Sequence, residues 1–128
     1  AYNGLSGTSF EPELSIDAVL DLADVDMRFW KLLAQFKPFG PSNLRPIFVT
    51  EGVKVVGVPT VVGNGHLKMK VKQKKSGVFD AIGFNMHEFL PAVRDGAAFD
   101  IAYVLEENFW NGRRTLQMRL KDIRLPTN

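Results

Sequence analysis

ENFWNGRRTLQMRLKDIR, at residues 107–124, is the stretch that decides the fold. Its centre, Asn111-Gly112, is typical of a two-residue β-hairpin turn, because both residues tolerate the positive φ that such a turn requires. After the turn, Leu116, Met118 and Leu120 alternate with polar residues, which is the period of a strand with one buried face. Residues 99–105 alternate in the same way. Residues 99–105 and the stretch at residues 107–124 therefore predict two antiparallel strands joined by a tight turn.

Three further strands are predicted upstream of this hairpin. Valines mark a strand at residues 53–58, and Pro59 indicates a bulge or an edge at its end. Asn64-Gly65 predicts a second two-residue hairpin turn. It leads into a strand at residues 66–72, in which apolar residues alternate with His66 and lysines. A third strand is expected at residues 78–84.

Two helices are predicted from apolar spacing and capping residues. Asn85 is expected to cap a short helix that turns Phe89 and Val93 inward. A longer amphipathic helix is expected at residues 25–36, with Asp24 as its cap. Its apolar face consists of Val25, Phe29, Leu32, Leu33 and Phe36. Both helices are expected to pack on a core.

Three strands, a short helix and two strands, in that order, match the oligonucleotide-binding (OB) fold, a mainly β, five-stranded barrel. Strand order alone leaves other small barrels open. Residues 14–18 alternate as a short strand, so a strand and an amphipathic helix are expected before the barrel. The expected divisions are a flexible arm at residues 1–12, the strand and helix at 13–37, a Pro/Gly connector at 38–48 and the OB-fold domain at 49–125.

Composition indicates a folded chain that is not embedded in a membrane. Hydrophobic residues make up 45% and charged residues 23% of the 128 residues, as in soluble globular proteins. No apolar run is long enough to span a bilayer, no secretory signal is visible, and no cysteine is present, so we expect a cytoplasmic protein. Residues 65–128 carry eleven Lys/Arg against seven Asp/Glu, so a polyanion-binding surface is sought in this half, and the alternative is an ordinary solvated surface.

Two motifs resemble the RecJ family of single-strand-specific DNA exonucleases. PFGPSNLRPIF at residues 38–48 is similar to the segment before the family's OB domain, with departures at Ser42 and Leu44. The stretch at residues 107–124 resembles the family's closing hairpin. The resemblance implies a manganese- or magnesium-dependent enzyme that degrades single-stranded DNA from the 5′ end in recombination and repair. It also implies that the catalytic domains lie upstream of this chain.

No catalytic or metal-binding set is predicted within the chain itself. The DHH motif of the family is absent, and the two histidines, His66 and His87, lack carboxylates at ligand spacing. We therefore expect no cofactor in this fragment. His66 is interpreted as an exposed strand residue or as an additional contact to nucleic acid.

A lysine ladder is the first candidate DNA-binding feature. Lys68, Lys70 and Lys72 are spaced by two, so their ammonium groups should leave one sheet face about 6.6 to 7 Å apart, near the spacing of phosphates in an extended strand. Lys74 extends the line. The alternative is that these lysines only keep an exposed strand soluble.

The closing hairpin supplies the other candidates. Arg113 and Arg114 follow the turn, and their guanidinium groups are expected to pair with a phosphate or stack on a base. Arg119 and Lys121 are expected to continue the basic surface. Phe109 and Trp110 are candidates for base stacking. For Trp110 the preferred interpretation is structural: it plugs the barrel end or packs on the helix at residues 25–36.

Two functions are compatible with these features. The first is a non-catalytic module that binds single-stranded DNA for the upstream nuclease domains of the same chain. The alternative is an interaction module that organises those domains or recruits a partner such as a single-strand-binding protein. An aromatic helix and a proline-rich connector motivate the alternative.

Overall fold

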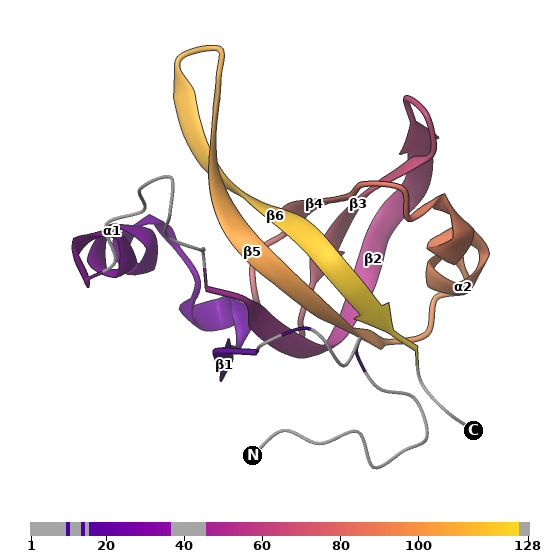
Figure 1. Ribbon diagram of the computed structural model, residues 1–128, viewed down its shortest axis with the longest axis horizontal. Coiled ribbons are helices and arrows are strands. Elements are labelled where there is room, and N and C mark those ends of the chain that lie inside the picture. The colour runs from indigo at the N-terminus through magenta and orange to yellow at the C-terminus, as the bar shows by residue number, and fades with distance from the viewer. Residues whose placement is uncertain (1–9, 11–13, 15, 37–45, 126–128) are drawn as a thin grey trace.

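The computed structural model describes residues 10, 14, 16–36 and 46–125 of the chain. The chain enters the barrel through β1 (Ala18–Val19), the 3-10 helix η1 (Leu22–Asp24) and helix α1 (Met27–Phe36). The other elements are β2 (Phe48–Val62), β3 (His66–Lys72), β4 (Phe79–Gly83), η2 (His87–Phe89), α2 (Leu90–Arg94), β5 (Phe99–Trp110) and β6 (Arg113–Arg124) (Figure 1). The mainly β class and the order of three strands, helix and two strands are as predicted.

The barrel closes because β2 pairs on both of its sides. The strand order is β1-β2-β3-β4-β6-β5, and β2 pairs again with β5. The first part of β2 is antiparallel to β5 and its second part is antiparallel to β3. Only β4 and β6 run parallel within the barrel. Five strands thus form the barrel of an OB fold, and β1 is a sixth strand added parallel to β2.

Two register shifts allow the long strand β2 to bend. One lies between Thr50 and Val53 opposite β5, and one between Val56 and Thr60 opposite β3. Gly52 and Gly57 take positive φ values of 71° and 78° at these places, which a residue with a Cβ adopts only with strain. Pro59, in the second shift, confirms the predicted bulge.

The predicted strand at residues 14–18 is wrong in position. β1 contains only Ala18 and Val19. Leu14 and Ile16 instead pack beside Val49, on the face of β2 opposite the barrel interior. Of the predicted arm, residues 1–9 and 11–12 lie outside the described part, and so do residues 38–45 of the predicted connector.

The two hairpin turns differ in length. Asn111 and Gly112, with φ values of 51° and 74°, join the paired residues Trp110 and Arg113, which confirms the predicted two-residue turn. The other turn is wrong by one residue, because residues 63–65 form a three-residue loop between Val62 and His66.

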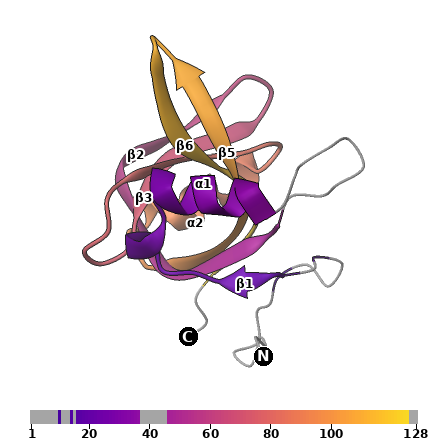
Figure 2. The ribbon, with the colours of Figure 1, turned by 90° about the vertical axis from the view of Figure 1, so that its left-hand side faces the viewer.

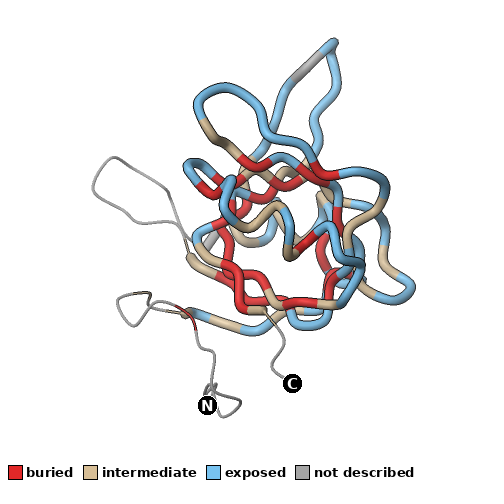
Figure 3. Tube along the Cα trace, turned by 90° about the vertical axis from the view of Figure 1, so that its right-hand side faces the viewer, coloured by how far each residue is buried: buried red, intermediate tan, exposed pale blue. Residues whose placement is uncertain are grey.

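Helices α1 and α2 lie at opposite ends of the barrel (Figures 1 and 2). Phe29 of α1 packs edge-on against the core residue Phe48, with ring centroids 6.0 Å apart. At the other end, Val93 of α2 is buried. Both ends of the apolar interior are therefore covered (Figure 3). No helix in the described part of the chain is long and apolar enough to span a membrane.

Both predicted helix caps are wrong. α1 is capped by Asp26, whose Oδ1 accepts the N–H of Phe29 at 2.8 Å, whereas Asp24 ends η1. Asn85 takes a left-handed φ of 59° before η2 and provides no side-chain cap. Within the predicted apolar face of α1, Leu32 is exposed, and the side chain of Phe36 lies outside the described part.

Candidate nucleic-acid interface

The outer face of β3 carries the predicted lysine ladder. Leu67, Met69 and Val71 point into the core and are almost fully buried. The alternating residues Lys68 and Lys70 are exposed, as the alternation predicted.

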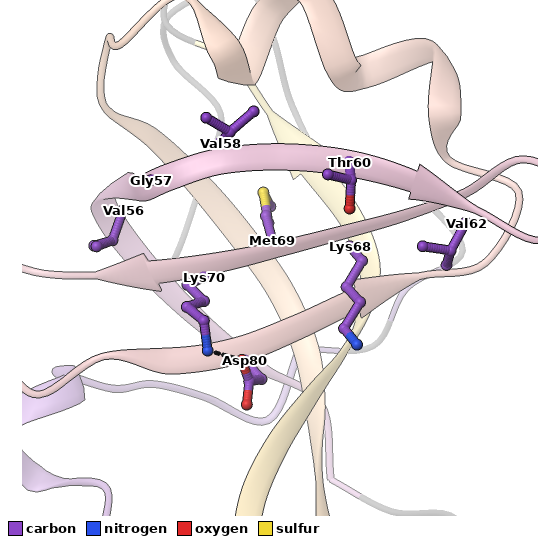
Figure 4. Close-up of a pocket in the computed structure, with 9 residues that line it drawn as sticks. All are labelled: Val56, Gly57, Val58, Thr60, Val62, Lys68, Met69, Lys70 and Asp80. Carbon is purple, nitrogen blue, oxygen red and sulfur yellow. Dashed lines mark hydrogen bonds and ion pairs between the residues drawn. The ribbon is translucent and has the colours of Figure 1, made fainter.

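A carboxylate interrupts this ladder. Asp80 on β4 lies opposite Lys70, and its Oδ1 is 2.9 Å from the Lys70 Nζ. Figure 4 shows both Lys68 and Lys70 directed toward β4, with the ion pair drawn at Lys70. The pair is exposed to solvent, so it is weak, but it offsets one charge of the ladder. The ladder is therefore not a uniform row of cations.

A groove of about 510 Å³ runs beside these two lysines. Its other wall is the bulged part of β2, where Val56, Val58 and Val62 line it (Figure 4). The groove thus combines an apolar side with a basic side. A nucleic acid strand has the same two properties, since its bases are apolar on their faces and its backbone is anionic.

A second hollow of about 890 Å³ continues from this groove toward the β5–β6 hairpin. Lys68 and Asp80 line both hollows. Its remaining lining residues come from the hairpin and are Asn108, Asn111, Arg113 and Thr115. Within the described residues, neither Lys68 nor Arg113 takes part in an ion pair. Two cations without an ion-pair partner among the described residues, the Asp80 carboxylate and several hydrogen-bonding side chains therefore face one space.

The projecting hairpin separates residues that the sequence had grouped together. Arg114 pairs with Phe109 across the strands, and neither lines the hollow that Arg113 lines. Because side chains alternate along a strand, Arg114 and Phe109 lie on the opposite face from Arg113. Arg114 is also within 3.7 Å of a carboxylate oxygen of Glu107. The side chain of Trp110 lies outside the described part, so both of its predicted roles stay predictions.

Arg119 lies on the same outer face, on β6, which is separated from the lysine ladder of β3 by β4. Its Nη1 is 3.6 Å from Glu106 Oε2, and its guanidinium carbon lies over the ring of Phe84 at 4.7 Å from the centroid. Phe84 is 44% exposed and meets the edge of the His66 ring at 4.9 Å. Sequence reasoning missed Phe84, although its position next to Gly83 at the end of a strand was visible. The sequence could not show that Phe84 meets His66 and Arg119, because the pairing of β4 with β3 and β6 brings these residues together.

Three other predicted cations lie outside both hollows. Lys72 is exposed opposite Lys54 of β2, and Lys74 is exposed in the turn after β3 with a φ of 47°. Lys121 is exposed at the register shift of β6. None of the three lines either hollow. Of the predicted cations, Lys68, Lys70 and Arg113 line the two hollows.

Arg124, although basic, is part of the structure rather than of the surface. It is 8% exposed, pairs with Asp100 and Glu51, and lies 5.0 Å from the centroid of Phe10. Burial lowers the pKa of Arg124 and raises the pKa of Asp100, and the hydrogen bond from the Gly52 N–H opposes the shift at Asp100. These charges join β2, β5 and β6 at the end of the barrel away from the hairpin tips.

The described residues do not fit a metal ion. They contain no group of three or more histidine, cysteine or acidic side chains that could hold one. His66 uses its Nδ1 to accept the N–H of Asn85 at 3.1 Å. A metal ligand set would need further ligands beside the remaining ring nitrogen.

Comparison with known proteins places the sequence in one group of relatives. Residues 16–122 match the model of the family described as the RecJ OB domain. The chain is 28% identical over 123 residues to the single-stranded-DNA-specific exonuclease RecJ of Bacillus subtilis, covering 95% of this chain and 16% of that protein. It is 30% identical over 112 residues to the protein of the same name from Salmonella typhimurium, covering 87% of this chain and 19% of that protein. The chain thus spans less than a fifth of these relatives.

Solved structures share the fold. RecJ from Thermus thermophilus in complex with Mn²⁺ superposes with a TM-score of 0.60 at 21% identity, over 90% of this chain and 16% of that one. The same protein with Mg²⁺ gives a TM-score of 0.58 at 19% identity, over 90% of this chain and 17% of that one. At this identity the likeness shows the fold alone.

Proposed function

This chain belongs to the RecJ OB-domain family, and from that premise we propose that it is the single-stranded-DNA-binding module of a RecJ-type exonuclease. One observation carries the proposal: Lys68 and Arg113, two cations of the outer face without a carboxylate partner among the described residues, line the same hollow. Each can neutralise one phosphate of a strand that crosses from β3 to the hairpin.

The catalytic part of the activity is assigned to the remainder of a longer protein. The curated relatives are named as exonucleases, and this chain spans 16% and 19% of their lengths. The solved RecJ structures in complex with Mn²⁺ and with Mg²⁺ support a metal-dependent nuclease part. In this proposal the OB module holds the strand and contributes no metal ligand.

Oligonucleotide titration at several salt concentrations tests the proposal. The parent chain should bind a single strand of mixed sequence at low salt, with affinity that falls steeply as salt rises. Lys68→Ala and Arg113→Ala should each weaken binding and reduce the salt slope by about 0.7, the value expected for one lost phosphate contact on a single strand.

The β5–β6 hairpin and helix α1 each provide a matched control variant. Arg114→Ala removes an arginine from the opposite face of the hairpin, and Lys31→Ala removes an exposed lysine from α1. Both variants should bind as the parent does. Equal losses in all four variants would show that only total charge matters, and the site would then be wrongly placed.

Phe109 supports a second function, that of a contact with another protein surface. Its side chain is 66% exposed and lies on the hairpin face away from the hollows, and exposed aromatic residues are enriched where proteins bind one another. The nuclease domains of the same protein and a single-strand-binding protein are the proposed partners. Phe109→Ser should leave DNA binding by this chain unchanged and weaken the partner contact in a longer RecJ protein, measured by limited proteolysis between the domains. Unchanged cleavage would contradict this role.

A further inference from the structure

Four side chains form a cluster on the outer face that has no part in the proposed binding by Lys68 and Arg113. We call it the Arg119 cluster, and it consists of His66 from β3, Phe84 at the end of β4, Glu106 from β5 and Arg119 from β6. Three strands and the turn that follows β4 thus contribute one residue each, because the register of the strands brings them together.

Phe84 is held in place from two sides. The His66 ring meets it at an interplanar angle of 77° and a centroid distance of 4.9 Å. His66 is itself fixed, since its Nδ1 accepts the N–H of Asn85 at 3.1 Å. The guanidinium of Arg119 lies over the ring at 4.7 Å. An aromatic ring that remains 44% exposed is therefore used as a support for Arg119 rather than as part of the core.

Arg119 is poorly suited to be a phosphate contact. Its charge is already offset by Glu106, with Nη1 and Oε2 3.6 Å apart. A phosphate would have to approach beside that carboxylate, and like charges at such a distance repel. The side chain is nevertheless 45% exposed. What remains available is the flat guanidinium, a group that stacks on planar π-systems.

We infer that Arg119, supported from below by Phe84, stacks against one unpaired base of a bound strand. The inference rests on the proposed DNA-binding function and replaces the expectation that Arg119 tracks the backbone. Lys68, Ile82 and Arg119 form one row across β3, β4 and β6, so the stack lies two strand spacings, about 10 Å, from the Lys68 backbone. A nucleotide can reach across this distance with its phosphate near Lys68 and its base over Arg119.

This arrangement selects for single strands. A duplex stacks its bases on one another and pairs their edges, so no base face is available to a guanidinium on a sheet surface. The ligand class is therefore a nucleic acid strand with unpaired bases, without a requirement for one particular base, since each base has a π-face.

The test compares two ligands and three variants, which are Arg119→Lys, Arg119→Ala and Arg114→Lys. One ligand is a single-stranded oligonucleotide of mixed sequence, and the other is an abasic strand of the same length, which keeps the phosphates and lacks the bases. Arg119→Lys keeps the charge and removes the plane, and Arg114→Lys makes the same change on the opposite face of the hairpin. Thermal unfolding of each variant confirms that the fold is kept.

Arg119→Lys should weaken binding of the base-bearing strand by about 5-fold to 150-fold, the range for the loss of one stacked base, with an unchanged salt slope. Its binding of the abasic strand should equal that of the parent, and Arg114→Lys should change neither. Two results would make Arg119 a phosphate contact and overturn the inference. One is an equal loss of affinity for both ligands in Arg119→Lys. The other is full affinity of Arg119→Lys for the base-bearing strand together with a reduced salt slope in Arg119→Ala. Absence of binding by the parent to either ligand at low salt would refute the proposed function itself, and the inference with it.

Discussion

At the scale of single residues, Tyr103 shows how a polar group is accommodated inside the barrel. Its side chain is fully buried, and its hydroxyl lies 2.7 Å from Thr50 Oγ1. Thr50 donates its own hydroxyl proton to the carbonyl of Leu20, so Tyr103 is the donor in the bond between them. This chain of hydrogen bonds connects β5, β2 and the segment after β1. The sequence predicted the inward direction of Tyr103 but could not indicate these partners.

Tyr103 should make the stability of the chain depend on alkaline pH. Burial raises the pKa of Tyr103 to about 12, and the Thr50 hydrogen bond only partly opposes this shift. The unfolded chain would release the phenol proton near its ordinary pKa of about 10. Stability from this group is thus complete below about pH 10 and falls as the pH rises toward 12, by about 2 to 3 kcal/mol for two pKa units.

Urea unfolding at several alkaline pH values measures this effect. Tyr103→Phe lacks the titrating hydroxyl, so its free energy of unfolding should fall less steeply than that of the parent between about pH 10 and 12. Parallel curves for the two proteins over this range would show that Tyr103 does not control alkaline stability.

The ion pairs of the outer face show where prediction from single residues ends. Alternation along β3 correctly predicted which lysines point outward. It could not indicate that Lys70 meets Asp80 and that Arg119 meets Glu106, because each partner is brought by another strand. The register between strands is set by the whole barrel and not by any one segment.

At the scale of elements, helix α1 was predicted in place but not in its capping. The apolar spacing located the helix correctly, since Met27–Phe36 lies within the predicted range. The cap was assigned to Asp24 because it precedes the apolar residues. In the structure, residues 22–24 instead form a separate 3-10 turn, and Asp26 takes the capping position.

Replacement of the two aspartates tests this assignment. Asp26→Ala removes the acceptor for the Phe29 N–H and should lower the free energy of unfolding by about 1 kcal/mol. Asp24→Ala changes an exposed residue of the same type two positions earlier and should have little effect. The comparison is made by urea unfolding at neutral pH. A larger loss for Asp24→Ala than for Asp26→Ala would restore the original prediction.

The β5–β6 hairpin shows the same limit for functional residues. Its turn was predicted correctly, because Asn111-Gly112 is a local signal. The basic and aromatic residues around that turn were treated as one site, although strand alternation places Arg113 and Arg114 on different faces. Clusters in sequence therefore had to be divided by face before a site could be assigned.

At the scale of the whole molecule, the element order was sufficient for the fold class but not for the closed barrel. Closure depends on the double pairing of β2 and on the parallel pair of β4 and β6. Both join segments far apart in the sequence, so no local pattern reports them. The same closure brings Lys68 and Arg113, which are distant in sequence, to one hollow.

The most direct test of the account is nuclear magnetic resonance mapping of the folded chain titrated with a single-stranded oligonucleotide at low salt. The amide shifts should change along the row of Lys68, Ile82 and Arg119 and around Arg113 and Thr115, on the face that contains both hollows. The amide shifts of α1 and of residues on the opposite face of the hairpin should stay unchanged. Changes concentrated on α1 or β1, or no changes at all, would contradict the claim that this face of the barrel binds the strand.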